Sequence, residues 1–380
     1  MKPKKELIAP IIRGMTSDGE TPLIVTCHED SVAELTLVNK EVTHETVKEW
    51  QGALSLFIEE HKRYPRSIKI AGEAWSMALG ATLEEAREKR GVSKDPTVER
   101  KVTRGNIMEG KVALVTGGAQ GFGEGIVRGL IAEGGFVYIA DMNLTGAQGL
   151  ARELNSQYKR EVAIPLYVNV TVEDSVEEML NEVALTTGSL DIFISNAGVL
   201  RAGSVKELTL KDFQFVTDVD YTGFFICSKF ASRQLAYQNM GSNGTLLSDI
   251  IVISSKSGLE GSNKNSAYAG AKFGVIGLAQ SFALELVSDN IKVNAICPGN
   301  FLDGPLWSDP EKGLFVQYLE AGKVPSAKTL HDVRRFYEAK VPLNRGCATQ
   351  DVVRAICYVV EQKYETGQAV PVTGGQVMLN

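Results

Sequence analysis

Residues 111–141 read KVALVTGGAQGFGEGIVRGLIAEGGFVYIAD, and this stretch decides the fold. The apolar run at 112–115 is typical of a buried parallel strand, and 136–140 is typical of a second one. Between them, apolar residues recur at helical spacing and predict a helix over 123–134. Strand, helix and strand in this order predict a β-α-β unit.

A glycine-rich turn joins the first strand to the helix. Thr116 and Gly117 begin the turn, and Gly121 and Gly123 lead into the helix. Glycines let the backbone pass close to a pyrophosphate, which binds at the partially positive N-terminus of the helix. A tight structural turn is the alternative interpretation, but the preceding strand and the acidic residue ending the next strand favour a dinucleotide site.

Asp141 is that acidic residue, and it follows the glycines by roughly 20 residues, as expected of a ribose-binding carboxylate. Its charge would repel the 2′-phosphate of NADP. No Arg or Lys lies in 117–123 or at 142–143 to offset that repulsion. The sequence therefore predicts NAD as the cofactor.

A second motif lies in the C-terminal half of the chain. Tyr268 and Lys272 are four residues apart and share one face of a predicted helix. The lysine charge favours the phenolate, so we expect it to draw the pKa of Tyr268 from about 10 towards neutral. Ser255 ends a predicted strand and can hold a substrate oxygen at the same place. Alone, the Tyr–Lys spacing is weak evidence, because a half-exposed tyrosine beside a snorkelling lysine is common.

Together these motifs resemble the short-chain dehydrogenase/reductase family over roughly residues 109–380. The family's glycine motif falls on residues 116–123, its Asn-Ala-Gly on 196–198, and its Pro-Gly on 298–299. Its serine-to-tyrosine spacing selects Ser255 rather than Ser254 or Ser257. The resemblance implies a Rossmann fold, a doubly wound parallel α/β sheet. It implies a catalytic set of Ser255, Tyr268, Lys272 and the residue at 220. It also implies a cofactor site made of Thr116, Gly117, Gly121, Phe122, Gly123, Asp141, Asn169, Val170, Asn196, Ala197, Gly198, Tyr268, Lys272, Pro298 and Gly299.

Two positions depart from the family pattern. Asp220 stands where the family usually has an asparagine that relays protons through water to the lysine. A carboxylate there can still bind water, but its charge would stabilise the lysine cation more strongly. Asn169 stands where the family has an aspartate that contacts adenine. Its amide carbonyl can accept a hydrogen bond from the adenine amino group.

A closer resemblance is to the sorbitol-6-phosphate 2-dehydrogenase subfamily of bacteria. It rests on residues 255–258, 265–268, 271–274, 341–347 and 372–378. The resemblance implies that the substrate pair is a polyol phosphate and a ketose phosphate. Lys256 and Lys264 flank the serine and could meet a phosphate, although a solvated surface role explains them equally well.

Composition limits the remaining classes of function. The chain has 380 residues, 44% of them hydrophobic, and a net charge of −6. This acidity, without a basic stripe, argues against nucleic-acid binding. Neither a signal peptide nor a transmembrane run is expected, so we predict no membrane partner. The 5 cysteines lack a Cys-x-x-Cys pair and favour reduced thiols in the cytoplasm. The 4 histidines lack metal-ligand spacing, so no metal is predicted.

The chain divides into three parts by pattern. Residues 1–90 are expected to form a small α+β extension, 91–108 a linker, and 109–380 the dehydrogenase domain. In the extension we expect strands at 23–26 and 67–71, an amphipathic helix at 46–61, and a charged helix at 84–90 with a capping box from Thr82 to Glu85. Residues 78–86 weakly resemble the end of the class II aldolase half of bacterial aldolase–dehydrogenase fusions. No His-x-His pair is present for an aldolase metal, so a packing or oligomerisation role is the expectation.

Helices and strands alternate through the rest of the chain, which predicts a parallel sheet with helices on both faces. We expect strands at 112–116, 136–140, 163–168, 191–195, 249–254, 291–296 and 369–372, and helices at 123–134, 144–157, 172–186, 209–239, 266–289, 330–338 and 349–361. Residues 300–340 form a long insertion with Trp307, Phe315 and Tyr318. At this position it would overhang the carboxyl ends of the strands, as a substrate lid.

The expected activity is reversible oxidation of a secondary alcohol on a sugar alcohol, with Tyr268 as the base. Two alternatives stay open. One is a reductase of ketoacyl thioesters or hydroxysteroids, and the other is a nucleotide-sensing or structural module, which only Asp220 favours. The resemblance to the family implies a homodimer or homotetramer, and Gly374, Gly375 and the apolar residues 377–379 suit a buried C-terminus.

Overall fold

The computed structural model describes residues 4–93 and 106–378, apart from 312, 321, 323 and 325. Its centre is a seven-stranded parallel sheet with the order β11-β10-β9-β8-β5-β6-β7. The Rossmann fold expected from the sequence is confirmed. The strands are β5 (Val112–Thr116), β6 (Phe136–Asp141), β7 (Ala163–Tyr167), β8 (Ile192–Ser195), β9 (Ser248–Ile253), β10 (Ile291–Pro298) and β11 (Ala369–Val372).

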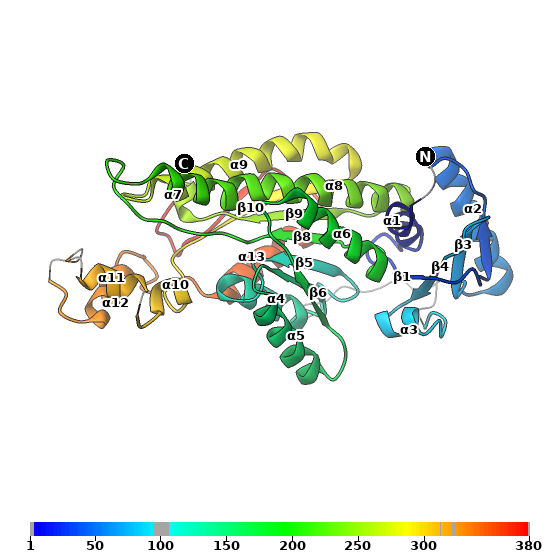
Figure 1. Cartoon of the computed structure of the whole chain (residues 1–380), viewed down its shortest axis with the longest axis horizontal. Coiled ribbons are helices and arrows are strands. Elements are labelled where there is room, and N and C mark those ends of the chain that lie inside the picture. Colours follow the sequence, from blue (N-terminus) through cyan, green and yellow to red (C-terminus); the bar gives the residue numbers. More distant parts are fainter. Residues whose placement is uncertain are drawn as a thin grey trace.

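Helices cover both faces of this sheet (Figure 1). One face is covered by α4 (Gly121–Ala132), α5 (Leu144–Tyr158) and α13 (Thr349–Glu361), which share one apolar core with the strands. The other is covered by α6 (Glu173–Thr187), α8 (Gly223–Gly241) and α9 (Ser266–Leu286). The inner strands β5, β8, β9 and β10 are buried along their whole length, which explains their largely apolar sequences, whereas the edge strands β7 and β11 are partly exposed.

The single helix expected at 209–239 is interrupted. It consists of α7 (Leu210–Thr217), a π-helical turn at Asp218–Thr222, and α8. A π-helical turn inserts one extra residue into the helical repeat, and such turns are frequent at functional sites. Here the turn carries Asp220.

The N-terminal residues form a second, four-stranded sheet with the order β1-β4-β3-β2. Its elements are α1 (Lys5–Met15), β1 (Ile24–His28), β2 (Leu35–Leu37), α2 (His44–His61), β3 (Ser67–Ile70), β4 (Ser76–Gly80) and α3 (Leu83–Arg87). They have their own apolar core, which includes Ile8, Trp50 and Leu79. The sequence did not predict α1, β2 or β4. Most of the expected linker, at 94–105, lies outside the described residues.

The expected capping box is only half formed. Thr82 Oγ1 accepts a hydrogen bond from the N–H of Glu85 at 3.2 Å. The Glu85 carboxylate, however, accepts from the N–H of Ala81 at 2.8 Å rather than from that of Thr82. The carboxylate therefore caps the chain one residue before the expected position.

Helix α1 packs closely against α8 and joins the extension to the sheet domain (Figure 1). Two glycines make this approach possible. A Cβ on Gly14 would lie 1.9 Å from the carbonyl oxygen of Gln238, and one on Gly241 would lie 2.2 Å from that of Ile11. Any side chain at either position would therefore force the two helices apart.

The insertion at 300–340 forms a separate helical lobe, at the opposite end of the molecule from the extension (Figure 1). It contains α10 (Pro305–Ser308), α11 (Leu314–Glu320) and α12 (Leu330–Glu338). Trp307, Phe315 and Tyr318 are buried against one another inside this lobe. These aromatics therefore hold the lobe together.

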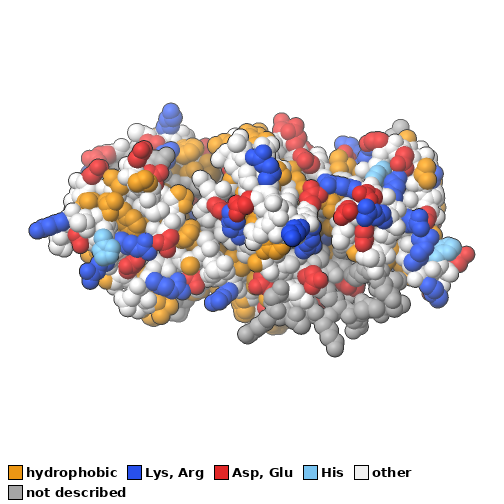
Figure 2. Space-filling view, turned by 90° about the horizontal axis from the view of Figure 1, so that it is seen from below, with side chains coloured by type: hydrophobic (Ala, Val, Ile, Leu, Met, Phe, Trp, Pro, Cys, Tyr) orange, Lys and Arg blue, Asp and Glu red, His pale blue; other side chains and the backbone are white. Residues whose placement is uncertain are grey.

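The surface is mixed in charge. Figure 2 shows acidic and basic side chains interspersed over the face that is turned towards the viewer. At the C-terminus, Met378 is 73% exposed in the single chain, so burial of the tail is not seen there, and Leu379 lies outside the described residues.

One helix differs from the expectation that no transmembrane run is present. Ser266–Asp289 is long and apolar enough to cross a membrane by length and composition. Its apolar residues have a second explanation, because one side of α9 packs against β10 and α8 and contributes Val275 and Ala279 to the core.

Candidate active site

The glycine turn forms a close-fitting cradle at the carboxyl end of β5. Gly117 and Gly121 have φ angles of +62° and +60°, which L side chains rarely adopt. A Cβ on Gly123 would lie 2.0 Å from the carbonyl oxygen of Gly117. Glycine is thus required sterically at 123 and conformationally at 117 and 121. The cradle exposes the N-terminus of α4, where a pyrophosphate can bind.

Residues at the end of β8 lock this cradle in place. The Thr116 hydroxyl oxygen accepts hydrogen bonds from the N–H groups of Asn196 at 3.0 Å and Ala197 at 3.2 Å. The Asn196 amide in turn donates to the carbonyl oxygens of Thr116 at 3.0 Å and Gly117 at 3.1 Å. The structure therefore brings these sequence-predicted residues together.

Asp141 ends β6 beside the same turn. Its carboxylate accepts from the N–H of Ala119 at 3.0 Å and from that of Asn143 at 2.8 Å. The side chain is partly exposed, so further lone pairs face outward. This arrangement fits a carboxylate that accepts hydrogen bonds from a ribose diol.

Asn169 and Val170 follow β7 on the same edge of the sheet. The Asn169 side-chain carbonyl already accepts from the Thr171 N–H at 3.1 Å and from the Thr171 hydroxyl at 2.8 Å. It is therefore less available to an adenine amino group than the sequence suggested. Val170 is buried, and a Cβ on Gly223 would lie 3.0 Å from its Cγ2.

The three residues of the second motif converge at the ends of β9 and α9. Lys272 is buried, and its ammonium donates to the carbonyl oxygen of Ile253 at 3.1 Å. The same nitrogen lies 5.5 Å from the centre of the Tyr268 ring. Ser255 lies close enough to the Tyr268 hydroxyl to lower its pKa. The structure thus brings the serine, the tyrosine and the lysine together.

Asp220 joins this site from the π-helical turn. Its Oδ2 lies 3.2 Å from Lys272 Nζ, and its Oδ1 accepts from the Val199 N–H at 2.7 Å. Both side chains of the ion pair are almost completely buried. A Cβ on Gly198 would lie 3.1 Å from Asp220 Oδ2 and 3.3 Å from Lys272 Nζ, so glycine leaves room for the pair.

The expectation that Lys272 draws the pKa of Tyr268 towards neutral is wrong. Burial of the hydroxyl raises the pKa of Tyr268 above 10, and the Asp220 carboxylate adds to the rise. Lys272 and Ser255 act in the opposite direction but do not outweigh burial. For Lys272, burial lowers the pKa, but Asp220 and Tyr268 more than offset this, so its pKa lies above the ordinary value.

Two contacts that position the site were not predicted. Ser254 Oγ donates to the carbonyl oxygen of Lys272 at 2.9 Å, which fixes α9 against the end of β9. Phe301, at the base of the insertion, stacks on Phe122 of the glycine turn with ring centres 4.6 Å apart. The adjacent serines 254 and 255 were a signal for the first contact, but no pattern pointed to the second.

Pro298 ends β10, and the N–H of Gly299 donates to the carbonyl oxygen of Val372 at 2.9 Å. A cavity of about 260 Å³ lies beside this turn and is lined by residues that include Gly299, Asn300, Arg345, Cys347 and Thr373. In the described part of the chain, no group of three or more His, Cys, Asp or Glu residues could hold a metal ion.

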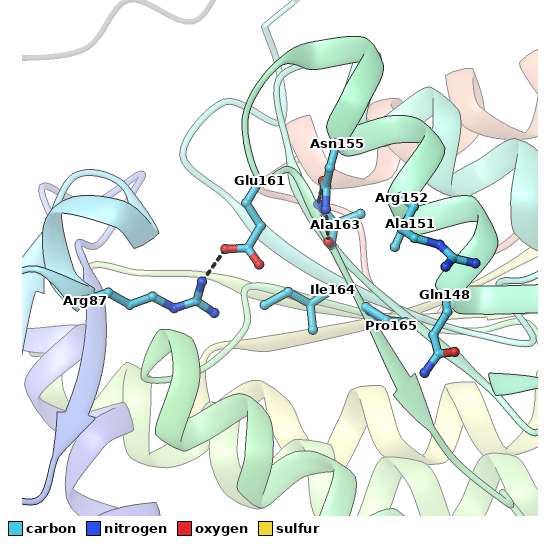
Figure 3. A pocket seen from close by; sticks show the side chains of 9 residues that line it. All are labelled: Arg87, Gln148, Ala151, Arg152, Asn155, Glu161, Ala163, Ile164 and Pro165. Carbon is cyan, nitrogen blue, oxygen red and sulfur yellow. Dashed lines mark hydrogen bonds and ion pairs between the residues drawn. The ribbon is translucent and has the colours of Figure 1, made fainter. Parts of the chain in front are cut away.

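A second cavity of about 290 Å³ lies between the extension and the sheet domain (Figure 3). Arg87 of α3 forms an ion pair with Glu161 across its mouth, and Asn155 donates to the carbonyl oxygen of Ala163. The Arg87–Glu161 ion pair therefore links the extension to the sheet domain at this cavity.

The family model for short chain dehydrogenases matches residues 111–309. The sorbitol-6-phosphate 2-dehydrogenase of Escherichia coli is 36% identical over 271 residues, which are 70% of this chain and 99% of that protein. About 30% of this chain therefore has no counterpart in that relative.

Solved structures agree with the family match. The sorbitol-6-phosphate 2-dehydrogenase of Erwinia amylovora is 38% identical, with a TM-score of 0.64 over 70% of this chain and 100% of that chain. A variant of actinorhodin polyketide ketoreductase with NADPH is 27% identical, with a TM-score of 0.60 over 70% of this chain and 97% of that chain. The chain belongs to the short-chain dehydrogenase/reductase family and is an oxidoreductase of alcohol and ketone groups.

Proposed function

We propose that this protein interconverts a secondary alcohol and a ketone on a phosphorylated hexitol, with NAD as the cofactor. The observation that carries the proposal is the convergence of Ser255, Tyr268 and Lys272, whose ammonium is fixed by Ile253 and Asp220. Similarity to two sorbitol-6-phosphate 2-dehydrogenases supports the substrate class.

The proton of the alcohol is handled by the protein. Tyr268, as phenolate, takes the hydroxyl proton of the substrate. Ser255 donates a hydrogen bond to the same substrate oxygen and so holds the C–O bond in place. The Lys272 ammonium has three N–H donors. It donates to the carbonyl oxygen of Ile253 and forms an ion pair with the Asp220 carboxylate. A remaining donor can bind a ribose hydroxyl of the cofactor.

The glycine cradle fits a dinucleotide. Gly117, Gly121 and Gly123 leave the backbone uncovered where a pyrophosphate approaches, and Asp141 offers acceptors for a ribose diol. A nicotinamide cofactor held by these residues would supply the acceptor for the hydride that leaves the carbinol carbon. The charge of Asp141 supports NAD over NADP.

Lys256 supports a phosphorylated substrate. It follows Ser255 directly, and its side chain is 16% exposed, so it lies close against the protein rather than extending into water. Its ammonium is 3.4 Å from Glu260, a contact long enough for a phosphate to replace. Lys264 lies in the loop that leads to α9 and is exposed.

We further propose that the enzyme is a cytoplasmic homodimer or homotetramer. All described cysteines are free, which suits a reducing compartment. Phe273 and Leu284 are exposed on α9, as expected of a helix that is covered by a second subunit.

The test is NADH formation by the purified protein with NAD and a panel of polyols, each with and without phosphate. Turnover restricted to a phosphorylated hexitol supports the full proposal. Turnover of other secondary alcohols alone keeps the chemistry and rejects the substrate. Reduction of a ketoacyl thioester with NADPH, without polyol oxidation, would instead support the reductase alternative. No turnover with any member of the panel, with NAD binding intact by calorimetry, would favour a nucleotide-sensing module.

A further inference from the structure

The Asp220–Lys272 ion pair places a full negative charge behind the base of the proposed reaction. Lys272 Nζ lies 3.2 Å from Asp220 Oδ2 and is also close to the Tyr268 ring. We propose that Asp220 is a positioning residue whose carboxylate holds the Lys272 ammonium and neutralises part of the charge that would otherwise act on the Tyr268 hydroxyl. This inference rests on the proposed function, in which Tyr268 is the base.

The geometry makes this ion pair a fixed feature. The π-helical turn directs Asp220 inward, and the Val199 N–H holds its Oδ1 at 2.7 Å. On the other side, Ser254 holds the backbone of Lys272, and Ile253 holds its ammonium. Neither partner can rotate away without losing a buried hydrogen bond, which is costly in an environment without water.

An ion pair acts on a neighbouring hydroxyl differently from a lone cation. A lone ammonium within about 4–6 Å favours a phenolate, whereas a paired carboxylate cancels part of that attraction. Four factors act on the pKa of Tyr268. Burial and the Asp220 carboxylate raise it, whereas the Lys272 ammonium and the uncharged Ser255 lower it. Cys297 of β10 also acts on Lys272, but burial raises the pKa of its thiol to about 11. The thiol therefore stays neutral below that pH.

Asp220 must be charged for this effect. Burial raises the pKa of its carboxyl, while Lys272 and the Val199 N–H oppose that rise. The carboxylate lies 3.2 Å from the Lys272 ammonium and accepts from the Val199 N–H at 2.7 Å, and both contacts favour its ionised form.

The expected consequence is an alkaline pH profile for alcohol oxidation, because this direction needs the phenolate. Asp220→Asn keeps the shape and removes the charge, and it should move the ascending limb of kcat/KM to lower pH by about one unit or more. Asp218→Asn is the matched control, since Asp218 lies on the same π-helical turn but is exposed. Its profile should match that of the wild type.

A second measurement does not depend on turnover. The ultraviolet absorbance of tyrosinate is titrated in each protein and in its Tyr268→Phe counterpart, and the difference isolates Tyr268. The midpoint for Asp220→Asn should lie below that of the wild type, with Asp218→Asn unchanged. If far-UV circular dichroism shows that Asp220→Asn is unfolded, Asp220→Ser removes the same charge and carries the same expectation.

The outcomes separate the two proposals. Superimposable tyrosinate titrations for the wild type and the neutral variant would overturn the role of Asp220, whatever the activity. Failure to oxidise any polyol would reject the proposed function, while a lowered Tyr268 midpoint in the variant would still support the role of Asp220.

Discussion

Arg13 of the N-terminal extension forms a two-bond ion pair with Asp191, at the start of β8 in the sheet domain. The Nη1–Oδ1 and Nη2–Oδ2 distances are both 2.8 Å, and both side chains are almost fully buried. Asp191 also accepts from the Val112 N–H at 2.7 Å. Burial raises the pKa of Asp191, but Arg13 more than offsets this, so its pKa is held below the ordinary value. The extension therefore supplies the buried cation that pairs with Asp191 of the sheet domain.

Arg13→Ala should be strongly destabilising, because it leaves the Asp191 charge buried without its partner. Breaking a buried ion pair in this way costs about 3–5 kcal/mol of the free energy of unfolding. Urea denaturation followed by circular dichroism measures the loss. Arg63→Ala is the control, since Arg63 pairs with Glu34 at the surface and should change stability little. Equal losses of stability in the two variants would show that the buried Arg13–Asp191 ion pair stabilises the protein no more than a surface ion pair.

Asp249, close to the same polar core, should make stability depend on pH. Burial raises its pKa to about 6, although Lys292 lies 3.0 Å away and opposes the rise. A raised folded-state pKa gives a stabilising contribution that is full below the unfolded value, about 4, and is lost as the pH rises through about 6. Asp249→Asn cannot titrate. Its unfolding free energy, measured between pH 5 and pH 8 (a range of about three units around that pKa), should fall less than that of the wild type. Parallel pH curves would contradict this assignment.

Much of the sheet domain could be predicted from the sequence, because continuous apolar strands and punctuating glycines act locally. The glycine turn, Asp141 and the Ser255–Tyr268–Lys272 set all lie at the carboxyl ends of the parallel strands. Helix α1 escaped prediction because Pro10 stands in its middle, and packing against α8 overrides that local signal. The direction of the Tyr268 pKa was also missed, since burial depends on the whole fold rather than on a spacing.

Asp141 should decide the cofactor preference. Asp141→Asn removes the charge that would repel a 2′-phosphate, although its single amide oxygen can accept from only one of the Ala119 and Asn143 N–H groups, which bind separate oxygens of the carboxylate. We expect the ratio of kcat/KM for NAD to that for NADP to fall about tenfold or more, which corresponds to about 1.4 kcal/mol. Steady-state kinetics with both cofactors measures the ratio. An unchanged ratio would place the discrimination elsewhere.

Lys256 should matter only for a phosphorylated substrate. Lys256→Gln is expected to raise KM for a hexitol phosphate about tenfold, because a charge-assisted contact to phosphate is lost, and to leave the KM for the free hexitol unchanged. Lys264→Gln, at an exposed position, is the comparison. Equal effects on the two substrates would remove Lys256 from the phosphate site.

The role of Tyr268 as the base is tested by the initial rate of NADH formation from NAD and sorbitol 6-phosphate, compared between the wild type and Tyr268→Phe. The wild type should turn over, and the variant should lose about 10²–10⁴-fold in kcat, as expected when a general base is removed. Its affinity for NAD, measured by calorimetry, should remain close to that of the wild type. A variant that retains the wild-type rate would contradict the account, because Tyr268 would then not be the base.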